Sequence, residues 1–249
     1  MDNYQYCAQL AARMIRSKLH EAKVLDFGCG AGQVINLLRN YGVSAFGCEA
    51  FYEGGKYPVP DELSGVVREM QGNAIPFPNC MFDVVINNQV MEHIEDIDAA
   101  ISEIHRVLKP GGTVISLFPD RSVWREGHSG VLFLHWAPKQ STFRIYYALL
   151  WRCIGFGTFT QGKSRLQWSK DICDWLDRWT VYRSYDEIAL AYGKHFSQMQ
   201  HIEDHWLESR IGLIARGLPT HLKQIFVRKM AGLVFTCAKT PCFGPPHSK

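Results

Sequence analysis

Short apolar runs alternate with amphipathic segments over the first half of the chain. Apolar residues recur at helical spacing in residues 4–20, in a segment that begins at Val34, and in residues 95–109. The runs between these helices are largely apolar, which is typical of short strands buried on both faces. The expected strands are residues 23–27, 43–48, 66–71, 82–87 and 113–118. Strands that alternate with helices predict an α/β fold with a parallel sheet covered on both faces.

This alternation breaks after Pro119. Residues 120–183 contain irregular and helical stretches and six of the seven tryptophans. The α/β pattern resumes at Ser184, because Ser184 and Glu187 have the spacing of a helix capping box. The remaining expected elements are a helix from 184 to about 192, a strand near 196–202, a helix near 218–230 and a strand near 233–238.

The composition is that of an ordinary globular protein. Of the 249 residues, 47% are apolar and 20% are charged, and the net charge is +3. This balance excludes a mostly disordered chain, and so small a net charge argues against a nucleic-acid partner. We expect one domain over residues 1–240, which includes an insert over 120–183, and a disordered tail over 241–249.

Targeting and metal-binding signals are absent from the sequence. No run of 18 uncharged apolar residues predicts a membrane-spanning helix. The N-terminus lacks the basic region and apolar stretch of a secretory signal. The eight cysteines form no CxxC pair. We therefore expect a cytoplasmic protein with reduced thiols, without disulfides and without a metal site.

A glycine-rich segment follows the first expected strand. Gly28-Cys29-Gly30-Ala31-Gly32 joins this strand to a helix, and such a turn lets the backbone approach a ligand closely. Asp26 stands two residues earlier, where a carboxylate would repel a pyrophosphate but accept a hydrogen bond from an ammonium group. Together these residues resemble motif I of the class I S-adenosylmethionine (SAM)-dependent methyltransferases.

Further segments extend this resemblance to Phe118. They are Glu49 at the end of the second strand, Gly72–Pro78, Phe82–Val85, Met91–Ile94 and Arg106–Gly112. The resemblance implies a Rossmann-like, doubly wound α/β fold. Its mostly parallel seven-stranded sheet would have an antiparallel last strand and an aromatic-rich helical insert after the fifth strand. It also implies SAM as the cofactor and S-adenosylhomocysteine as the product.

The resemblance assigns a cofactor site. Backbone groups of Gly28 and Gly30 would line the methionine end, Asp26 would face the ammonium group, and Glu49 would bind two ribose hydroxyls. Asn73 replaces the aspartate that the family has beside the adenine, and its amide oxygen accepts the same hydrogen bond. The implied cofactor-binding residues are Asp26, Gly28, Cys29, Gly30, Gly32, Glu49, Ala50, Asn73, Ala74 and Asn88.

Two of these assignments have alternatives. Asn88 and its neighbour Asn87 either contact the methionine moiety or only turn the chain where the fourth strand ends. After Glu49, residues 50–57 replace the helix that the family pattern has there. Ala50 or Phe51 would pack on the adenine.

The sequence shows no definite catalytic constellation. Transfer from a sulfonium depends largely on positioning, and a base is needed only where the acceptor must lose a proton. Histidines are the candidates near neutral pH. His93 follows the fourth strand, whereas His128 and His135 follow the fifth, where this family often builds its acceptor site. The alternative for each is a structural or surface role.

The insert over 120–183 is expected to cover the methyl acceptor, and residues 143–154 form an amphipathic pattern inside it. The residues on its apolar face are Phe143, Tyr146, Tyr147, Leu150, Trp151 and Ile154. This face packs as core or as a lid, or it forms a dimer interface. Alternatively, residues 139–155 make peripheral contact with a membrane or a lipid-linked acceptor.

These observations favour a SAM-dependent methyltransferase that acts on a small or medium acceptor. An O-methyl transfer to a glycan, a lipid or quinone-like ring, or a specialised metabolite is expected. Two alternatives stay open. One is a nucleic-acid or protein methyltransferase, although no basic face or added RNA-binding domain is evident. The other is a catalytically silent partner protein with the same fold.

Overall fold

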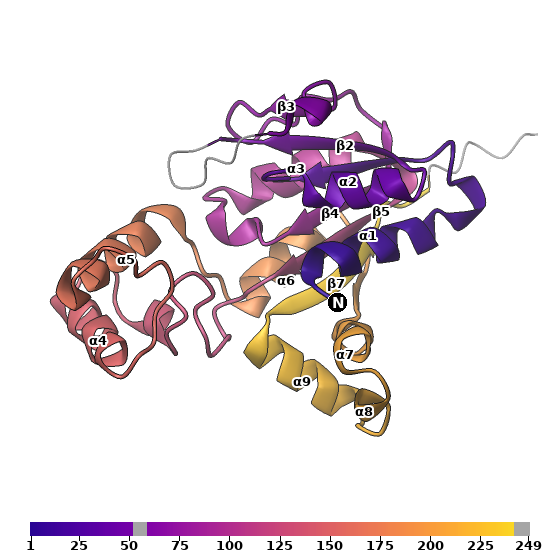
Figure 1. The fold of residues 1–249 in the computed structure, drawn as a ribbon. Helices are drawn as coiled ribbons and strands as arrows, with labels where there is room; N and C mark the ends of the chain where they lie inside the picture. The colour runs from indigo at the N-terminus through magenta and orange to yellow at the C-terminus, as the bar shows by residue number, and fades with distance from the viewer. Residues whose placement is uncertain (52–58, 242–249) are drawn as a thin grey trace, which may run out of the picture.

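A seven-stranded sheet forms the centre of the computed structural model, which describes residues 1–51 and 59–241 (Figure 1). Its strand order is β3-β2-β1-β4-β5-β7-β6. The strands are β1 (Lys23–Phe27), β2 (Ser44–Glu49), β3 (Val67–Glu69), β4 (Phe82–Asn88), β5 (Leu108–Phe118), β6 (Met199–His201) and β7 (Leu233–Ala238). The first five strands pair in parallel, and β7 is antiparallel to both of its neighbours. The predicted sheet and its antiparallel last strand are therefore confirmed.

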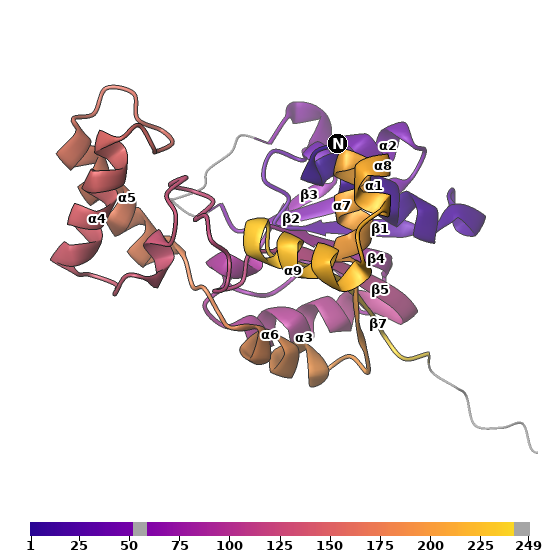
Figure 2. The ribbon, with the colours of Figure 1, turned by 90° about the horizontal axis from the view of Figure 1, so that it is seen from below.

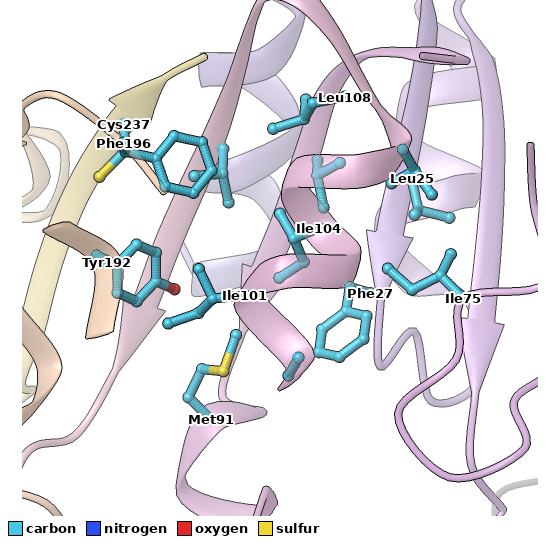
Figure 3. Packing of buried hydrophobic residues seen from close by; sticks show 14 of the residues in the cluster. Leu25, Phe27, Ile75, Met91, Ile101, Ile104, Leu108, Tyr192, Phe196 and Cys237 are labelled. Atoms are coloured by element: carbon cyan, nitrogen blue, oxygen red, sulfur yellow. The ribbon is translucent and has the colours of Figure 1, made fainter. Parts of the chain in front are cut away.

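Helices cover both faces of this sheet (Figures 1 and 2). One face packs against α1 (Asn3–Met14), α2 (Gln33–Asn40), α7 (Glu203–Ile211), α8 (Leu213–Arg216) and α9 (Thr220–Met230). The other face packs against α3 (Ile97–Val107) and α6 (Tyr185–Gly193). On this second face, Ile101 and Ile104 of α3 lie between Phe27 of β1 and Tyr192 of α6 (Figure 3). Two buried layers on opposite faces make the fold doubly wound, as predicted.

Several element boundaries differ from the sequence expectation. The first helix ends at Met14, and residues 16–18 continue as a 3₁₀ turn. Helix α3 ends at Val107 because β5 already begins at Leu108. Pro110 lies in β5 but in a register shift between the Leu108 and Thr113 pairings, where a missing N–H costs no ladder hydrogen bond. Residues 203–216 form α7 and α8, which the sequence pattern did not predict because this segment has no clear apolar period.

The insert forms a separate layer beside the sheet. Helices α4 (Thr142–Cys153) and α5 (Arg165–Trp179) pack on each other and project away from the strands in both views (Figures 1 and 2). Their small core consists of Val131, Leu134, Ala148, Trp168, Ile172, Cys173 and Leu176. The predicted aromatic-rich helical insert after the fifth strand is confirmed, and its role as an acceptor cover stays a prediction. The expected tail lies, apart from Pro241, outside the described residues, as does most of the 50–57 segment.

Candidate active site

Three adjacent strands bring three loops to one edge of the sheet. Phe27 at the end of β1 pairs with Asn87 of β4, and Asn88 of β4 pairs with Leu117 of β5. Because parallel strands end at the same edge, the segments that follow β1, β4 and β5 lie next to one another there. These segments are the glycine loop (residues 28–32), the segment of Glu92 and His93, and the loop that carries His128.

The glycine loop has a backbone conformation that disfavours other residues. Gly28, Gly30 and Gly32 have φ angles of +70°, +51° and +79°. A Cβ atom at Gly28 would lie 2.5 Å from a methyl group of Val90, and one at Gly32 would overlap Leu63. The loop therefore packs directly against the segment that follows β4, with no room for a side chain at these positions.

Glu49 ties the glycine loop to the end of β2. One carboxylate oxygen accepts a hydrogen bond from the Gly30 N–H at 2.7 Å, and the other accepts one from the Ala50 N–H at 2.9 Å. The N–H groups of Gly28 and Cys29 both donate to the Cys48 carbonyl at 2.9 and 3.1 Å. The loop is thus fixed from outside by β2. Each Glu49 oxygen keeps a second lone pair, so its predicted role toward ribose hydroxyls stays open as a prediction.

Asp26 is buried beneath this loop, with 3% of its surface exposed. Burial and, to a smaller extent, the neighbouring Glu49 carboxylate raise the pKa of Asp26 well above its usual range. Two carboxyl groups thus converge where β1 and β2 end. A group that carries positive charge fits this anionic environment.

The remaining predicted cofactor residues lie around the same edge. Asn73 and Ala74 follow β3, in a turn where the Asn73 side chain donates to the Asp96 carbonyl at 3.4 Å. Asn88 ends β4, and its buried amide oxygen has no hydrogen-bond partner among residues 1–51 and 59–241. Asn87 instead faces away from the loops, because its side-chain amide donates to Tyr192 at 3.2 Å.

Two of the three predicted histidines meet, and the third lies apart. The rings of His93 and His128 have centroids 5.0 Å apart, and Trp175 of α5 lies against both. His135 instead has its Nε2 atom 3.2 Å from the Arg121 carbonyl. The neighbours of His135, Arg121 and Trp136, line an open pocket of about 680 Å³ on the α9 side.

Glu92 joins the two histidines and was not among the residues predicted from the sequence. Its side chain is buried, and neither carboxylate oxygen has a hydrogen-bond partner in the part of the chain that the structure describes. Burial raises the pKa of Glu92 to about 7. One ligand atom of each of Glu92, His93 and His128 lies within 4.8 Å of the other two. These three residues are called the EHH cluster below.

The two histidines of the EHH cluster are held by different acceptors. His93 Nδ1 donates to the Trp179 carbonyl at 2.7 Å, and burial lowers the pKa of His93 to about 4. His128 Nδ1 donates to Glu126 at 2.8 Å. Burial alone would lower the pKa of His128, but the contact with Glu126 outweighs burial and raises it.

Glu126 is the second residue that the sequence did not single out. It is fully buried and accepts hydrogen bonds from His128 Nδ1, from the Tyr182 hydroxyl at 2.7 Å and from the Ser129 N–H at 2.5 Å. Burial alone would raise the pKa of Glu126, but these hydrogen bonds outweigh it and lower the pKa to about 2. The Glu92-His93 dipeptide was a visible signal for the EHH cluster, whereas no local pattern marks Glu126 or Tyr182.

Comparison with known proteins assigns part of the chain to a family. Residues 25–116 match a family model described as a methyltransferase domain. This region belongs to the class I SAM-dependent methyltransferases. It contains the glycine loop, Glu49 and two members of the EHH cluster, whereas His128 and Glu126 lie beyond it. The family expected from the sequence motifs is confirmed.

Individual relatives of the methyltransferase region are only distantly similar. A probable SAM-dependent methyltransferase of Mycolicibacterium smegmatis is 32% identical over 109 residues, which are 42% of this chain and 40% of the relative. A ubiquinone biosynthesis O-methyltransferase of Chelativorans sp. is 29% identical over 124 residues, which are 47% of this chain and 49% of the relative. The chain thus spans about half the length or less of these curated relatives.

The similarity in three dimensions extends further than the similarity in sequence. A SAM-dependent methyltransferase from Mesorhizobium loti superposes with a TM-score of 0.52 at 13% identity. The match covers 95% of this chain and 100% of that one. At this identity the likeness supports the fold, including the strands and helices that follow the methyltransferase region.

Proposed function

We propose that the protein is a SAM-dependent methyltransferase that transfers a methyl group to a hydroxyl of a small or medium acceptor. A glycan, a lipid or quinone-like ring, or a specialised metabolite is the expected class of acceptor. The observation that carries this proposal is the adjacency of the glycine loop and the EHH cluster. Val90, which touches Gly28, stands two residues before Glu92. A cofactor at the loop and an acceptor at the cluster would therefore be neighbours.

The residues at the ends of β1 and β2 fit the cofactor. When bound, SAM supplies an activated methyl group on a sulfonium. Asp26 would bind the ammonium group of its methionine end, because a buried carboxylate without a countercharge favours a cation. Glu49 holds the glycine loop through Gly30 and would offer its remaining lone pairs to the ribose hydroxyls. The buried amide oxygen of Asn88 would accept a further hydrogen bond from the ligand.

The EHH cluster fits the acceptor hydroxyl. A hydroxyl must lose its proton to accept a methyl group, and buried polar side chains beside the donor can hold its oxygen. Positioning in a site that excludes water contributes much of the acceleration in such a displacement. The ubiquinone biosynthesis O-methyltransferase from Chelativorans sp. supports an oxygen acceptor, since it is similar to 47% of this chain and transfers its methyl group to oxygen.

Calorimetric titration with SAM tests the cofactor half of the proposal. We expect one binding site in the wild type and no detectable binding for Gly28→Leu, because the new side chain would occupy the space of Val90. A screen of hydroxylated acceptors that follows release of S-adenosylhomocysteine tests the other half. Turnover that Glu92→Gln leaves unchanged would contradict the acceptor site, and binding of SAM without turnover on any hydroxylated acceptor would contradict the proposed reaction.

We also propose that the outer face of α4 contacts an anionic membrane surface. Phe143, Tyr146, Leu150 and Ile154 are 62–66% exposed along this face, whereas Tyr147 and Trp151 pack on the core of the insert. Residues 139–170 contain six Lys and Arg residues and no Asp or Glu, and five of these six remain when Arg144, which is buried against Asp177, is set aside. Exposed apolar residues within a cationic segment are typical of interfacial helices. No described helix is long and apolar enough to cross a membrane.

Sedimentation with vesicles tests this contact. The wild type should bind vesicles that contain anionic lipid more strongly than neutral ones, and added salt should weaken the binding. Leu150→Glu should lower the partition coefficient by about tenfold, since it replaces an apolar side chain at the interface by a charge. The matched control is Leu190→Glu on α6, where Leu190 is 68% exposed outside the segment. Equal loss in both variants would argue against the α4 face.

A further inference from the structure

The EHH cluster combines two features that a protein interior disfavours. Glu92 carries two buried carboxylate oxygens that lack a hydrogen-bond partner within the described ranges. The Glu92 carboxylate lies beside the imidazole rings of His93 and His128. A buried carboxylate without a hydrogen bond is costly, so such a group indicates a missing partner. That partner must suit one carboxylate oxygen and two imidazole nitrogens together.

The second nitrogen of each ring supports the same conclusion. Since the Trp179 carbonyl only accepts hydrogen bonds, Nδ1 of His93 carries the proton and Nε2 carries the ring's lone pair. His128 is oriented in the same way by a carboxylate, because its Nδ1 atom donates to Glu126. A histidine that binds a metal through one nitrogen usually donates its other N–H to a carboxylate or a backbone carbonyl. Here His128 donates to a carboxylate, and His93 donates to a backbone carbonyl.

We propose that Glu92, His93 and His128 bind a divalent first-row transition-metal ion through one carboxylate oxygen and the two Nε2 atoms. Two imidazoles and one carboxylate are a ligand set for Zn²⁺, Fe²⁺ or Co²⁺, whereas Mg²⁺ and Ca²⁺ prefer oxygen ligands alone. This site departs from the sequence expectation of no metal, which rested on the absence of cysteine pairs. The signal was missed because His128 lies 35 positions beyond His93 in a segment without periodicity.

The dimensions of the cluster require only a small contraction. Ligand atoms that share one ion at about 2.1 Å each lie no more than about 4.2 Å apart. One ligand atom of each residue now lies within 4.8 Å of the other two, so a movement of several tenths of an ångström brings three such atoms to this spacing. The charges also balance, since Glu92 and Glu126 supply two negative charges against one divalent cation. Three protein ligands leave positions on the ion open for water or an acceptor oxygen. Only the binding of an acceptor oxygen rests on the proposed function.

Cobalt is the probe that tests the site, because bound Co²⁺ shows visible absorption that reports its ligands. The full chain, stripped with a chelator, should take up one Co²⁺ and develop d–d bands, and Zn²⁺ should displace it. Excess Mg²⁺ should not displace it. Glu92→Gln and His128→Gln should each weaken Co²⁺ binding by at least about tenfold. His135→Gln is the matched control, since this histidine is on the same loop region outside the cluster, and it should leave the affinity unchanged.

Glu126→Gln tests the positioning role separately. The amide keeps the size of the side chain but weakens the hydrogen bond that it accepts from His128. The affinity for Co²⁺ should therefore fall by about 10- to 100-fold, while the d–d bands are retained. Circular dichroism and a thermal melt in the absence of metal show that each variant is folded. No uptake of Co²⁺ by the wild type, or uptake that persists in the Glu92→Gln/His128→Gln double variant, would overturn the metal site. Metal uptake without SAM binding would contradict the proposed function and leave this inference standing.

Discussion

The cofactor half of the protein (residues 23–118) and the insert (residues 120–183) hold their buried polar groups in different ways. In the cofactor half, Glu49 is bonded by N–H groups of the glycine loop and of its own neighbour Ala50. In the insert, Glu126 reaches Tyr182 across 56 positions, and Arg144 forms a buried ion pair with Asp177 across 33 positions. Glu49 is thus fixed by nearby backbone, whereas Glu126 and Arg144 also need side chains that are distant in the sequence.

This difference implies that each part can lose its structure and its role without the other. The buried core of the insert shares no residue with the two cores that cover the faces of the sheet. The parts meet at the EHH cluster, where the Trp179 carbonyl accepts from His93 and the Val181 N–H donates to the Glu92 carbonyl at 2.7 Å. Damage to the insert should therefore remove acceptor chemistry while the glycine loop keeps its ligand.

The buried ion pair of the insert offers the largest expected effect. Asp177→Asn leaves the Arg144 guanidinium, which is 2% exposed, without its carboxylate. Removal of one partner of a buried ion pair costs about 3–5 kcal/mol. We expect hydrogen exchange to show α4 and α5 opening in the variant while the sheet remains protected. Calorimetric SAM affinity should stay within about twofold of the wild type.

A second ion pair on the same helix is the matched control for Asp177→Asn. Asp174 pairs with Arg178 at 3.0 Å, but both side chains are mostly exposed at 59% and 65%. Exposed pairs contribute about 0–1 kcal/mol, so Asp174→Asn should leave exchange in the insert nearly unchanged. If both variants opened the sheet as well as the insert, the two parts would be one cooperative unit.

The same contrast explains how much could be predicted from the sequence. The glycine loop, Glu49, the strands and the capping box at Ser184 depend on residues close together in the chain, so the sequence pattern predicted them. Glu126 and Tyr182 acquire their roles only when distant segments meet, and no periodicity records such a contact. A motif assigned Asp26 and Glu49 to the cofactor site. Glu92 also lies in a motif, but the sequence pattern assigned it no role and did not predict its burial. Helices α7 and α8 were missed because charged residues interrupt their apolar face.

Gly28→Ala gives the next largest effect and acts on the cofactor half alone. The new Cβ atom would lie 2.5 Å from a Val90 methyl group, and the φ angle of +70° is strained for alanine. Such strain costs about 1–3 kcal/mol, and the displaced loop should weaken SAM binding by about tenfold or more. Exchange in the insert should not change, which is the converse of Asp177→Asn.

Addition of Val90→Ala separates the two causes of the Gly28→Ala defect. It removes both Val90 methyl groups, so the part due to overlap should recover and the part due to φ should remain. Gly193→Ala is the control, because a Cβ atom there would meet no atom within 4 Å. Wild-type affinity in Gly28→Ala would show that the ligand lies elsewhere.

Asp26→Asn gives the smallest change in stability. Unlike Asp177→Asn and Gly28→Ala, which destabilise the protein, it should stabilise the protein. Burial and the Glu49 carboxylate raise the pKa of Asp26, so the folded protein without ligand binds the Asp26 proton more tightly than the unfolded chain does. This residue therefore contributes most stability at low pH and loses it as the pH rises from the unfolded pKa of about 3.9 through the folded value. The neutral amide avoids this loss, and we expect Asp26→Asn to raise the free energy of unfolding at pH 7 by roughly 1 kcal/mol.

The same substitution should weaken SAM binding, because only the carboxylate attracts the ammonium group. Three thiols near Asp26, those of Cys7, Cys29 and Cys48, have pKa values raised by burial and stay neutral, so they add no competing charge. Binding to the wild type should release a proton below the folded pKa of Asp26, and calorimetry in buffers of different ionisation enthalpy measures it. The variant should release none, and Asp61→Asn, which changes an exposed acid, should behave as the wild type does. Equal proton release in wild type and Asp26→Asn would remove Asp26 from the cofactor site, because a group that binds the ammonium must give up its proton to do so.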